Sequence, residues 1–402
     1  MKTNAIPSFG LLQGVRVVHL TTSVAGPYCA CRMADMGADV IWIENPKGMD
    51  FMRTSITAEV ERRNMRFLSL NTPTEEGKKI FAELLKTTDI LIDSFKGQQM
   101  AKWGLTDEAM HEINPGLIIC HISGFGQSGD PEYVELASYD PIAQAFGCYM
   151  IQNGFPDRKP VPAFPVVADY MTAMQTAYCA MAALYRREKN GGIGEVIDAA
   201  QYECMMSVQG GQVAGYLNNG VLPQREGSHS LAAAGYGAYT CKDGVDIYTL
   251  CLGVGVVPKM LTLLGLEYGS ELFPKGMPIV PMVAPGAKVL EEALQKYCDQ
   301  YTAIEVEQNF RKAGLPCSRI YDYTMAVEDP HYQAREVFTE WTNGDGKTIK
   351  GHNIFPKLKN NPGQIWRGLQ KSGTDTADIL EELGYTAEQV AAFAADKTVI
   401  LA

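Results

Sequence analysis

Residues 15–44, VRVVHLTTSVAGPYCACRMADMGADVIWIE, decide the fold class of this 402-residue chain. Residues 15–20 and 39–44 are rich in Val, Ile and Leu and predict two strands, and residues 27–36 predict a helix that ends at Gly37. Two strands joined by a helix form a βαβ unit, in which the strands lie parallel in one sheet. We therefore expect the chain to begin with a parallel sheet.

The same alternation of strands and helices continues to residue 122. Residues 74–85 and 106–113 predict helices, and residues 89–93 and 117–122 predict two further strands. Four strands with helices between them favour a doubly wound α/β domain. The fold class expected from the sequence is therefore α/β.

Composition and charge narrow the class of protein. With 46% hydrophobic and 20% charged residues, the chain can bury a sizeable core and form two or three domains. Residues 1–7 lack the apolar core of a signal peptide, and no run of about 18 apolar residues offers a membrane span, so we expect a cytoplasmic protein. The net charge of −11 disfavours nucleic-acid binding.

Cysteine and histidine are dispersed along the chain. The ten cysteines form no CxxC pair and the six histidines no HExxH motif, so we expect reduced thiols, no metal and no disulfide framework. His121, in an apolar run, is expected to be a core histidine with satisfied nitrogens. If the acidic chain binds an anionic cofactor it must gather cations locally, and the candidates are Lys96 and Lys102, followed by Arg62, Arg63 and Arg66.

Asp169 is the candidate catalytic residue. It closes the apolar, proline-containing segment of residues 162–170 and stands in or just before the first turn of a predicted helix that ends after Arg187. Asp is a favoured N-cap residue, so helix capping is one interpretation. The other interpretation is that Asp169 is a nucleophile, because helix N–H groups and apolar neighbours can keep a carboxylate ionised and reactive. The helix carries one apolar stripe, formed by Met171, Met174, Tyr178, Met181 and Tyr185.

Residues 124–129, Gly-Phe-Gly-Gln-Ser-Gly, match the G-x-G-x-x-G pattern of dinucleotide-binding proteins and directly follow a predicted strand. The pattern binds a dinucleotide only when its third glycine lies in the opening turn of a helix. Asp130 and Pro131 follow at once and predict a turn instead. A dinucleotide-dependent oxidoreductase that uses Gly124 to Gly129 remains the alternative class of function.

The second half of the chain changes character near residue 225. Residues 194–198 predict a strand, and the Met-rich residues 201–216 predict a packed helix. Beyond 225, residues 235–252 predict a hairpin and residues 289–313 are helical in pattern, which indicates a second, smaller domain.

Several landmarks in fixed order resemble the class III CoA-transferases of the CaiB/BaiF type, over residues 12–401. They are the segments 25–27, 37–44, 123–126 and 139–145, and the Asp169 segment followed by residues 194–198. Within the family, residues 163–165 and 359–368 make the chain most similar to carnitine (crotonobetaine or gamma-butyrobetaine) CoA-transferase. Residues 137–140 also resemble the bile-acid CoA-transferases, and a CoA-transferase for a 2-hydroxy acid such as 2-hydroxyisocaproate or phenyllactate is a further alternative.

The resemblance implies a covalent mechanism, in which Asp169 attacks the acyl-CoA thioester and CoA then passes to the acceptor acid. CoA and acyl-CoA are substrates, and no permanently bound cofactor is implied. Positions that bind or flank CoA in the family correspond to Lys96, Lys102, Ala25, Leu70, Ser94, Phe95 and Tyr139, and a loop containing Gly235 and Gly237 is placed near the site as a possible oxyanion hole. Val24 and Trp103 depart from the glutamine and arginine of relatives.

The resemblance also implies an architecture. We expect a large Rossmann-like CoA-binding domain from residues 1–200 and 330–402, a linker at 201–224 and a small α+β domain at 225–329. Two subunits are expected to form an interlocked homodimer, with an acyl-CoA and a small carboxylic acid as its ligands.

Overall fold

The computed structural model describes residues 6–402, so the first five residues, which belong to the segment searched for a signal peptide, lie outside it. The chain divides into two compact units. The larger unit consists of the chain up to Met150, Pro162–Val221 and Glu336–Ala402, and the smaller consists of Ile151–Val161 and Leu222–Arg335. Among the described helices, none has both the length and the apolar character needed to cross a bilayer.

A six-stranded sheet forms the centre of the larger unit. Its strands are β1 (Arg16–Leu20), β2 (Asp39–Glu44), β3 (Met65–Ser69), β4 (Ile90–Asp93), β5 (Ile118–Ser123) and β6 (Glu195–Ala200). The order is β3-β2-β1-β4-β5-β6, and every neighbouring pair is parallel. This is the doubly wound arrangement. The predicted α/β class is therefore confirmed.

Strand β3 was missed by the sequence analysis because Arg66 interrupts its apolar run. In the structure Arg66 is buried and pairs with Asp39 and Glu382. A charge that is paired within the fold is compatible with a buried strand, but its partners cannot be recognised from the sequence around it.

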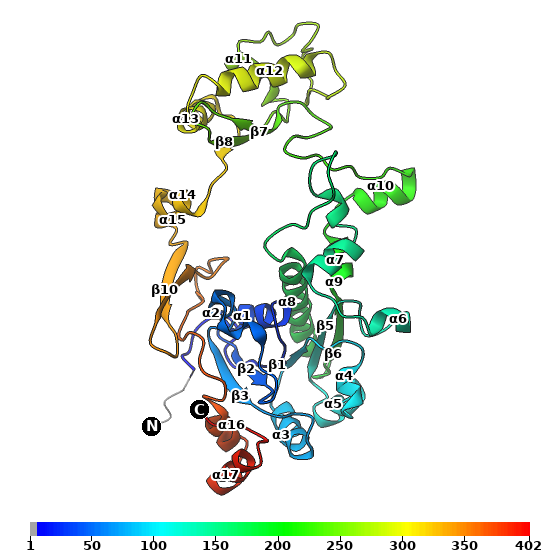
Figure 1. Ribbon diagram of the computed structural model, residues 1–402, viewed down its shortest axis with the longest axis vertical. Helices are drawn as coiled ribbons and strands as arrows, with labels where there is room; N and C mark the ends of the chain where they lie inside the picture. The colour runs from blue at the N-terminus through cyan, green and yellow to red at the C-terminus, as the bar shows by residue number, and fades with distance from the viewer. Residues whose placement is uncertain (1–5) are drawn as a thin grey trace. The chain divides into compact units, whose positions relative to one another are not determined.

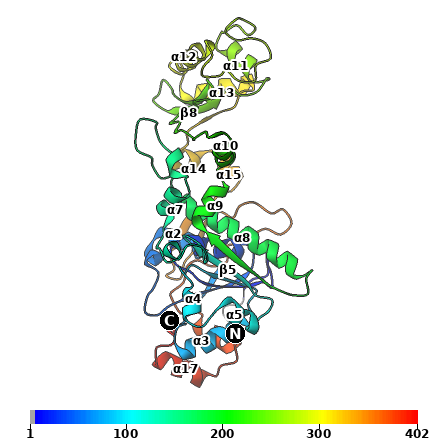
Figure 2. The same ribbon diagram turned by 90° about the vertical axis from the view of Figure 1, so that its right-hand side faces the viewer.

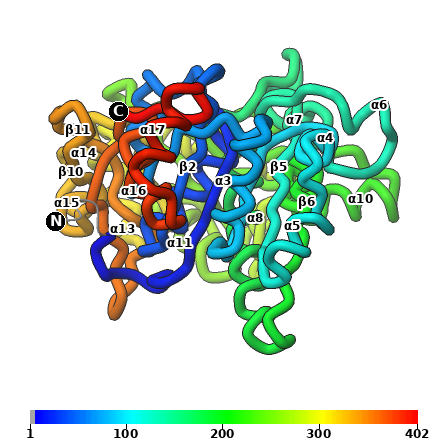
Figure 3. The backbone as a smooth tube through the Cα atoms, turned by 90° about the horizontal axis from the view of Figure 1, so that it is seen from below, coloured from blue at the N-terminus to red at the C-terminus, as the bar shows by residue number. Residues whose placement is uncertain are grey.

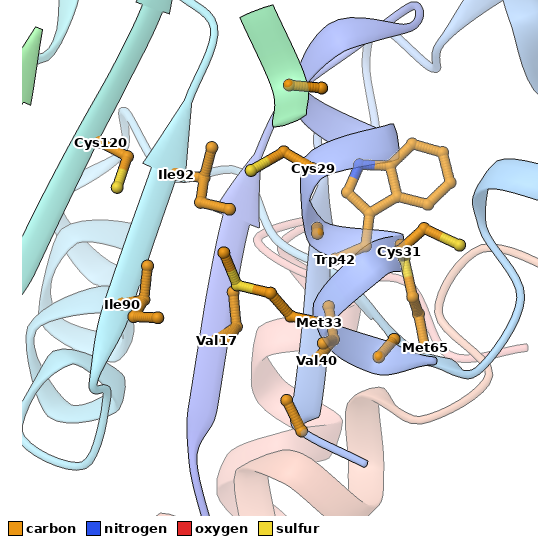
Figure 4. Packing of buried hydrophobic residues seen from close by; sticks show 14 of the residues in the cluster. Val17, Cys29, Cys31, Met33, Val40, Trp42, Met65, Ile90, Ile92 and Cys120 are labelled. Carbon is orange, nitrogen blue, oxygen red and sulfur yellow. The ribbon is translucent and has the colours of Figure 1, made fainter. Parts of the chain in front are cut away.

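Helices cover both faces of the sheet (Figure 1). Helices α1 (Ala25–Ala34) and α8 (Val167–Arg187) pack on one face, where Trp42, Met33 and Cys29 lie in the cluster drawn in Figure 4. The other face is covered by α3 (Glu75–Leu85), α4 (Gln99–Lys102), α5 (Asp107–Ile113), α16 (Thr376–Glu382) and α17 (Ala387–Ala395). Burial on both faces explains why the inner strands β1, β2, β4 and β5 are mostly apolar.

The C-terminal segment returns to the N-terminal half of the chain, as Figure 3 shows for α16 beside the first strands. Asn64 donates to the Gln364 carbonyl and accepts the Trp366 N–H, and Asp375 accepts the Phe67 N–H. Both ends of the chain therefore build one unit.

Helix α8, which runs beside β5 in Figure 2, buries small side chains rather than its predicted apolar stripe. The buried positions are Ala168, Asp169, Thr172, Ala173, Thr176 and Ala180. Small side chains let α8 approach α1 and the sheet closely. Tyr178 and Tyr185 of the stripe are instead 74% and 66% exposed.

The smaller unit contains a three-stranded antiparallel sheet, with β7 (Tyr236–Thr240), β8 (Asp246–Leu250) and β9 (Cys317–Arg319). Helices α11 (Val257–Leu263), α12 (Gly286–Cys298) and α13 (Ala303–Ala313) share its core, and α14 (Tyr323–Glu328) and α15 (Pro330–Ala334) follow. The predicted hairpin at 235–252 is confirmed. Residues 201–224, expected as a linker, instead hold α9 (Gln201–Ser207) and α10 (Gln212–Asn219).

The remaining short elements lie in the larger unit. They are η1 (Phe51–Thr54), α2 (Ile56–Glu61), α6 (Pro131–Val134), α7 (Asp140–Phe146), and the antiparallel pair β10 (Phe338–Thr342) and β11 (Thr348–His352). The short η2 (Met150–Gln152) spans the boundary between the two units. Within residues 6–402 the structure contains no disulfide bond.

Candidate active site

A cavity of about 350 Å³ lies where the strand order reverses between β1 and β4. Its walls are the loop after β1 (residues 22–26), Ser94 and Lys96 after β4, residues 122–124 at the end of β5, and residues 136–139. Residues 49–51, Asp169 and Gln201 complete the lining. Doubly wound sheets bind their ligands in the crevice at this switch point.

Asp169 is the third residue of α8, and its side chain faces this cavity from a nearly buried position with 9% exposure. The N-cap of α8 is Val166, so the interpretation of Asp169 as the N-cap is wrong. The first-turn N–H of Ala168 is satisfied by Asp140, whose Oδ1 accepts it at 2.6 Å. Because a carboxylate from another helix does the capping, Asp169 is left available for chemistry.

One hydrogen bond holds the Asp169 carboxylate. Gln201 donates from Nε2 to Oδ1 at 2.5 Å, and within residues 6–402 no other hydrogen bond to the carboxylate is formed. Burial and the nearby charge of Asp140 raise the pKa of Asp169 to about 7, while the Gln201 hydrogen bond acts to lower it. Near neutral pH the carboxyl therefore exists in both protonation states.

Helix α7 positions the segment that leads into Asp169. The buried Gln144 side chain donates to Asp140 Oδ2 at 2.7 Å and to the Ala163 carbonyl at 3.0 Å, and it accepts the Ala163 N–H at 2.9 Å. Asp140 and Ala163 are thus tied to one side chain. Neither Asp140 nor Gln144 was singled out from the sequence, although the Asp-Pro pair at 140–141 is a helix-start signal that could have drawn attention to them.

A buried ion pair shapes the loop after β1. Ser23 has a φ of +65° and donates its N–H to Asp50 Oδ2 at 3.0 Å. Arg62, fully buried, pairs with the same carboxylate and donates to the Ser23 carbonyl at 2.6 Å. Arg63 is likewise paired with Asp35, and Arg66 is paired with Asp39 and Glu382. These three arginines, the weaker cation candidates, therefore serve the fold and do not present free charges to a ligand.

The residues that the sequence assigned to CoA separate into neighbouring groups. Ala25, Ser94, Lys96 and Tyr139 line the 350 Å³ cavity, together with Val24. A second cavity of about 240 Å³ is lined by Leu70, Phe95 and Trp103, and the two cavities share Thr22 and Asp50. Phe95 and Trp103 meet edge to face, with ring centroids 5.1 Å apart. The departure from arginine at position 103 therefore makes this second cavity more aromatic.

Lys96 and Lys102 converge on one residue of the loop before α7. Lys96 Nζ donates to the Glu135 carbonyl, and Lys102 Nζ pairs with the Glu135 carboxylate, each at 2.9 Å. Lys102 is largely exposed, so its ion pair is readily exchanged for another anion.

Residues 124–129 do not form a dinucleotide-binding turn. The next helix, α6, begins only at Pro131 and has four residues, so Gly129 opens no helix that could hold a pyrophosphate. Gln127 instead ties its own loop to β6 and to the loop after β4. Its N–H is donated to Asp198 and its side-chain amide to the Phe95 carbonyl. Gly124 permits close approach of residue 138, because a Cβ at position 124 would lie 2.1 Å from the Ser138 Cβ.

His121 is buried with both nitrogens satisfied, as predicted. Nδ1 lies 2.6 Å from Asp93 Oδ2 and Nε2 lies 3.0 Å from Asp107 Oδ1. Burial acts to lower the His121 pKa, but the hydrogen bonds and charges of Asp107 and Asp93 raise it to about 10. The imidazolium therefore bridges β4 and α5 next to the loop that carries Ser94 and Lys96.

Gly235 and Gly237 belong to the smaller unit. Gly235 has a φ of +70° and donates its N–H to Glu291 Oε1 at 2.6 Å, and Gly237 lies in β7 opposite Thr249. A role for the Gly235 N–H in an oxyanion hole would require that hydrogen bond to be exchanged.

The candidate active site is thus a cavity at the switch point of a doubly wound sheet, and it contains the Asp169 carboxyl group. A sequence model of CoA-transferase family III matches residues 12–376. A CaiB/BaiF family protein from Brucella suis is 29% identical and has a TM-score of 0.80, covering 94% of this chain and 100% of that chain. Rv3272 from Mycobacterium tuberculosis shares the fold at 21% identity, with a TM-score of 0.80, and covers 93% of this chain and 99% of its own.

The chain belongs to CoA-transferase family III. It is therefore a transferase that uses CoA and acyl-CoA as substrates, as the resemblance predicted.

Proposed function

We propose that this CoA-transferase moves CoA from an acyl-CoA to a free carboxylic acid through covalent intermediates on Asp169. The observation that carries the proposal is a carboxyl group in the switch-point cavity, with a pKa near 7, one oxygen held by Gln201 and the other without a hydrogen bond. A carboxylate held in this way has one oxygen available to attack a thioester.

The N-terminus of α1, which borders the cavity that contains Asp169, suits the negative charge that develops during this attack. Ala25 and Gly26 line the same cavity at the N-terminus of α1. Backbone N–H groups at a helix N-terminus stabilise a negative charge, here the oxyanion formed on the thioester carbonyl. We retain Gly235 and Gly237 as further candidates for this role.

We assign CoA to the two adjoining cavities. Ala25, Ser94, Tyr139 and Lys96 border the cavity that contains the reacting carboxylate, and Lys102 is an exposed cation that can pair with a phosphate. Leu70, Phe95 and Trp103 give the second cavity apolar and aromatic walls of the kind that accept a planar base.

For the acyl group we propose a carnitine-type betaine acid, on the basis of the sequence resemblance at residues 163–165 and 359–368. A 2-hydroxy acid and a bile acid are the alternatives. Assaying betaines, 2-hydroxy acids and bile acids as acceptors against one acyl-CoA donor separates the three classes. A preference for either alternative class would overturn the betaine assignment.

We also propose that the enzyme is a cytoplasmic homodimer. The dimer is supported by the exposed stripe on α8, where Met174, Tyr178 and Tyr185 present apolar area that a second copy would cover. Light scattering after size exclusion should give the dimer mass, and Tyr178→Glu should lower it. A monomeric wild type would contradict the proposal.

The nucleophile is tested by mixing the enzyme with acyl-CoA, quenching, and measuring the intact mass. A mass increase that maps to Asp169 is expected, and Asp169→Ala should abolish both the adduct and turnover. Glu188→Gln, which removes a carboxylate at the other end of α8, is the matched control and should react normally. Full transferase activity in Asp169→Ala would refute the proposal.

A further inference from the structure

We propose that Gln201 is a catalytic residue, whose side-chain amide stabilises the oxyanion formed when a nucleophile attacks the carboxyl carbon of Asp169. This role rests on the covalent function proposed for Asp169. It concerns the steps that occur at the aspartyl carbonyl itself, rather than those at the carbonyl of the substrate.

The fold places Gln201 with little freedom. Strand β6 ends at Ala200, and Gln201 is the first residue of α9, so its side chain lies at the carboxyl edge of the sheet with 6% exposure. Its Nε2 donates to Asp169 Oδ1 at 2.5 Å, and its Oε1 accepts from Ser138 Oγ at 3.4 Å. An acceptor on one side and a hydroxyl donor on the other orient the amide with its N–H toward Asp169.

The two helices that carry Asp169 and Gln201 are also bound to each other farther along. Gln175 of α8 donates from Nε2 to the Cys204 carbonyl of α9 at 3.1 Å and accepts from Ser207 Oγ at 3.1 Å. This second contact joins the two helices but reaches neither Asp169 nor the Gln201 amide, which is held by its own hydrogen bonds at the end of β6. A donor held in place before the reaction needs no reorganisation when charge develops.

The position of the amide on Oδ1 divides the roles of the two carboxylate oxygens. Oδ2 attacks the thioester carbon, a C–O bond forms, the C–S bond breaks, and CoA leaves as the thiolate. The product is a mixed anhydride in which Oδ2 is the bridging atom and Oδ1 is the aspartyl carbonyl oxygen. Gln201 then donates to that carbonyl oxygen.

The next step takes place at the aspartyl carbon. The CoA thiolate attacks it, the C=O electron pair moves onto Oδ1, and the intermediate collapses by breaking the bond to Oδ2, which releases the donor acid as its carboxylate. An aspartyl-CoA thioester results. The acceptor carboxylate attacks the same carbon, again placing charge on Oδ1, and expels the thiolate, which finally attacks the new acyl carbonyl and frees Asp169. Both attacks at the aspartyl carbon thus develop an oxyanion at the atom that Gln201 contacts.

A neutral amide suits this position better than a cation would. It donates to the free carboxylate, to the carbonyl of either intermediate and to the oxyanion, while leaving Asp169 without a tightly paired charge. Val24, which lines the same cavity, has no side-chain donor, and the single hydroxyl proton of Ser138 is shared between Gln201 Oε1 and the Tyr139 carbonyl. Among the side chains of residues 6–402, Gln201 is the one that donates to Asp169.

Gln201→Met tests the role, because methionine has a similar length and cannot donate. Wild type, Gln201→Met and Gln175→Met are mixed with butyryl-CoA, or with the acyl-CoA that wild type turns over fastest, then quenched at successive times for intact-mass analysis. Attack on the substrate carbonyl should persist in Gln201→Met, so the acyl adduct should accumulate. Its conversion to the CoA adduct should slow by about 100-fold, the usual loss for one oxyanion donor.

The control Gln175→Met removes both hydrogen bonds of Gln175 to α9 without touching Asp169, and it should form both adducts at rates close to wild type. If Gln201→Met does not fold, Gln201→Asn, which keeps the amide but withdraws it by one methylene, should show the same accumulation to a smaller degree.

The outcomes separate this inference from the function on which it rests. Equal adduct conversion in wild type and Gln201→Met would overturn the role of Gln201 and leave Asp169 as the nucleophile. A loss in Gln175→Met as large as that in Gln201→Met would overturn it too, because helix displacement would then explain the effect. If wild type forms no adduct and Asp169→Asn keeps full turnover, the covalent function itself is refuted.

Discussion

Asp140 accepts the backbone N–H of Ala168 through Oδ1 at 2.6 Å, so a carboxylate on α7 caps the helix that carries Asp169. The arrangement brings the Asp140 carboxyl group close to Asp169. Burial is the larger cause of the raised pKa of Asp169, and the charge of Asp140 raises that pKa further. One residue therefore both completes the helix start and tunes the group beside it.

Asp140→Asn should move the acid limb of the kcat/KM profile to lower pH. The nucleophile must be ionised, so the limb of wild type is expected near pH 7. Asparagine can still offer an oxygen to Ala168 while removing the charge that raises the Asp169 pKa. The variant should lose about 1 kcal/mol of stability because its amide faces Gln144. An acid limb that does not move would show that Asp140 does not tune the nucleophile.

Asp169→Asn should be more stable than wild type at pH 8, although inactive. The folded-state pKa of Asp169 is raised from 3.8 to about 7, so ionisation costs the folded state more than the unfolded state. Wild type should therefore lose stability relative to the variant as pH rises from about 4 to 7, by on the order of 2–4 kcal/mol at the plateau. Urea unfolding at pH 4.5 and pH 8 measures the difference. Equal stabilities at both pH values would contradict it.

His121→Leu should destabilise the protein and weaken acyl-CoA binding. The folded-state pKa of His121 is raised from 6.5 to about 10, so its contribution is fully present below pH 6.5 and is lost as pH rises through 10. The expected cost at pH 6 is about 2–4 kcal/mol, because Asp93 would remain buried without its partner. His121→Gln, which keeps one donor, should lose less. Urea unfolding at pH 6 and pH 10.5 measures the loss of unfolding free energy in His121→Leu. An equal loss at both pH values would show that a charged His121 does not bridge Asp93 and Asp107.

Gly26→Ala should raise the KM for acyl-CoA and lower stability by about 1–3 kcal/mol. A Cβ on residue 26 would lie 2.4 Å from the Thr21 side chain, so α1 would have to move away from the end of β1. Gly215→Ala, in a part of α10 with nothing within 4 Å of the new Cβ, is the control and should be neutral or slightly stabilising. Unchanged steady-state kinetics in Gly26→Ala would show that the α1 start does not bind the substrate.

Local pattern in the sequence was sufficient for most of the large unit. The strands β1, β2, β4 and β5 lie where runs of Val, Ile and Leu predicted them, because strands covered on both faces are apolar along most of their length. The less apolar β6 begins one residue after its predicted start at 194. Strand β3 escaped because Arg66 is compensated by Glu382, more than 300 residues away. The order of the strands also required the structure, since pairing depends on which edges meet and not on the strands themselves.

The sequence by itself determined the α/β class, the family and the place of Asp169 in the first turn of a long helix, because these depend on local periodicity and on landmarks in order. Only the tertiary structure decided what surrounds Asp169. Asp140, Gln201 and the buried small-residue face of α8 reach it from separate elements, and contacts between elements distant along the chain leave no local pattern. The acidity of a carboxyl group depends on those neighbours, so its chemistry is set by the fold that brings them together.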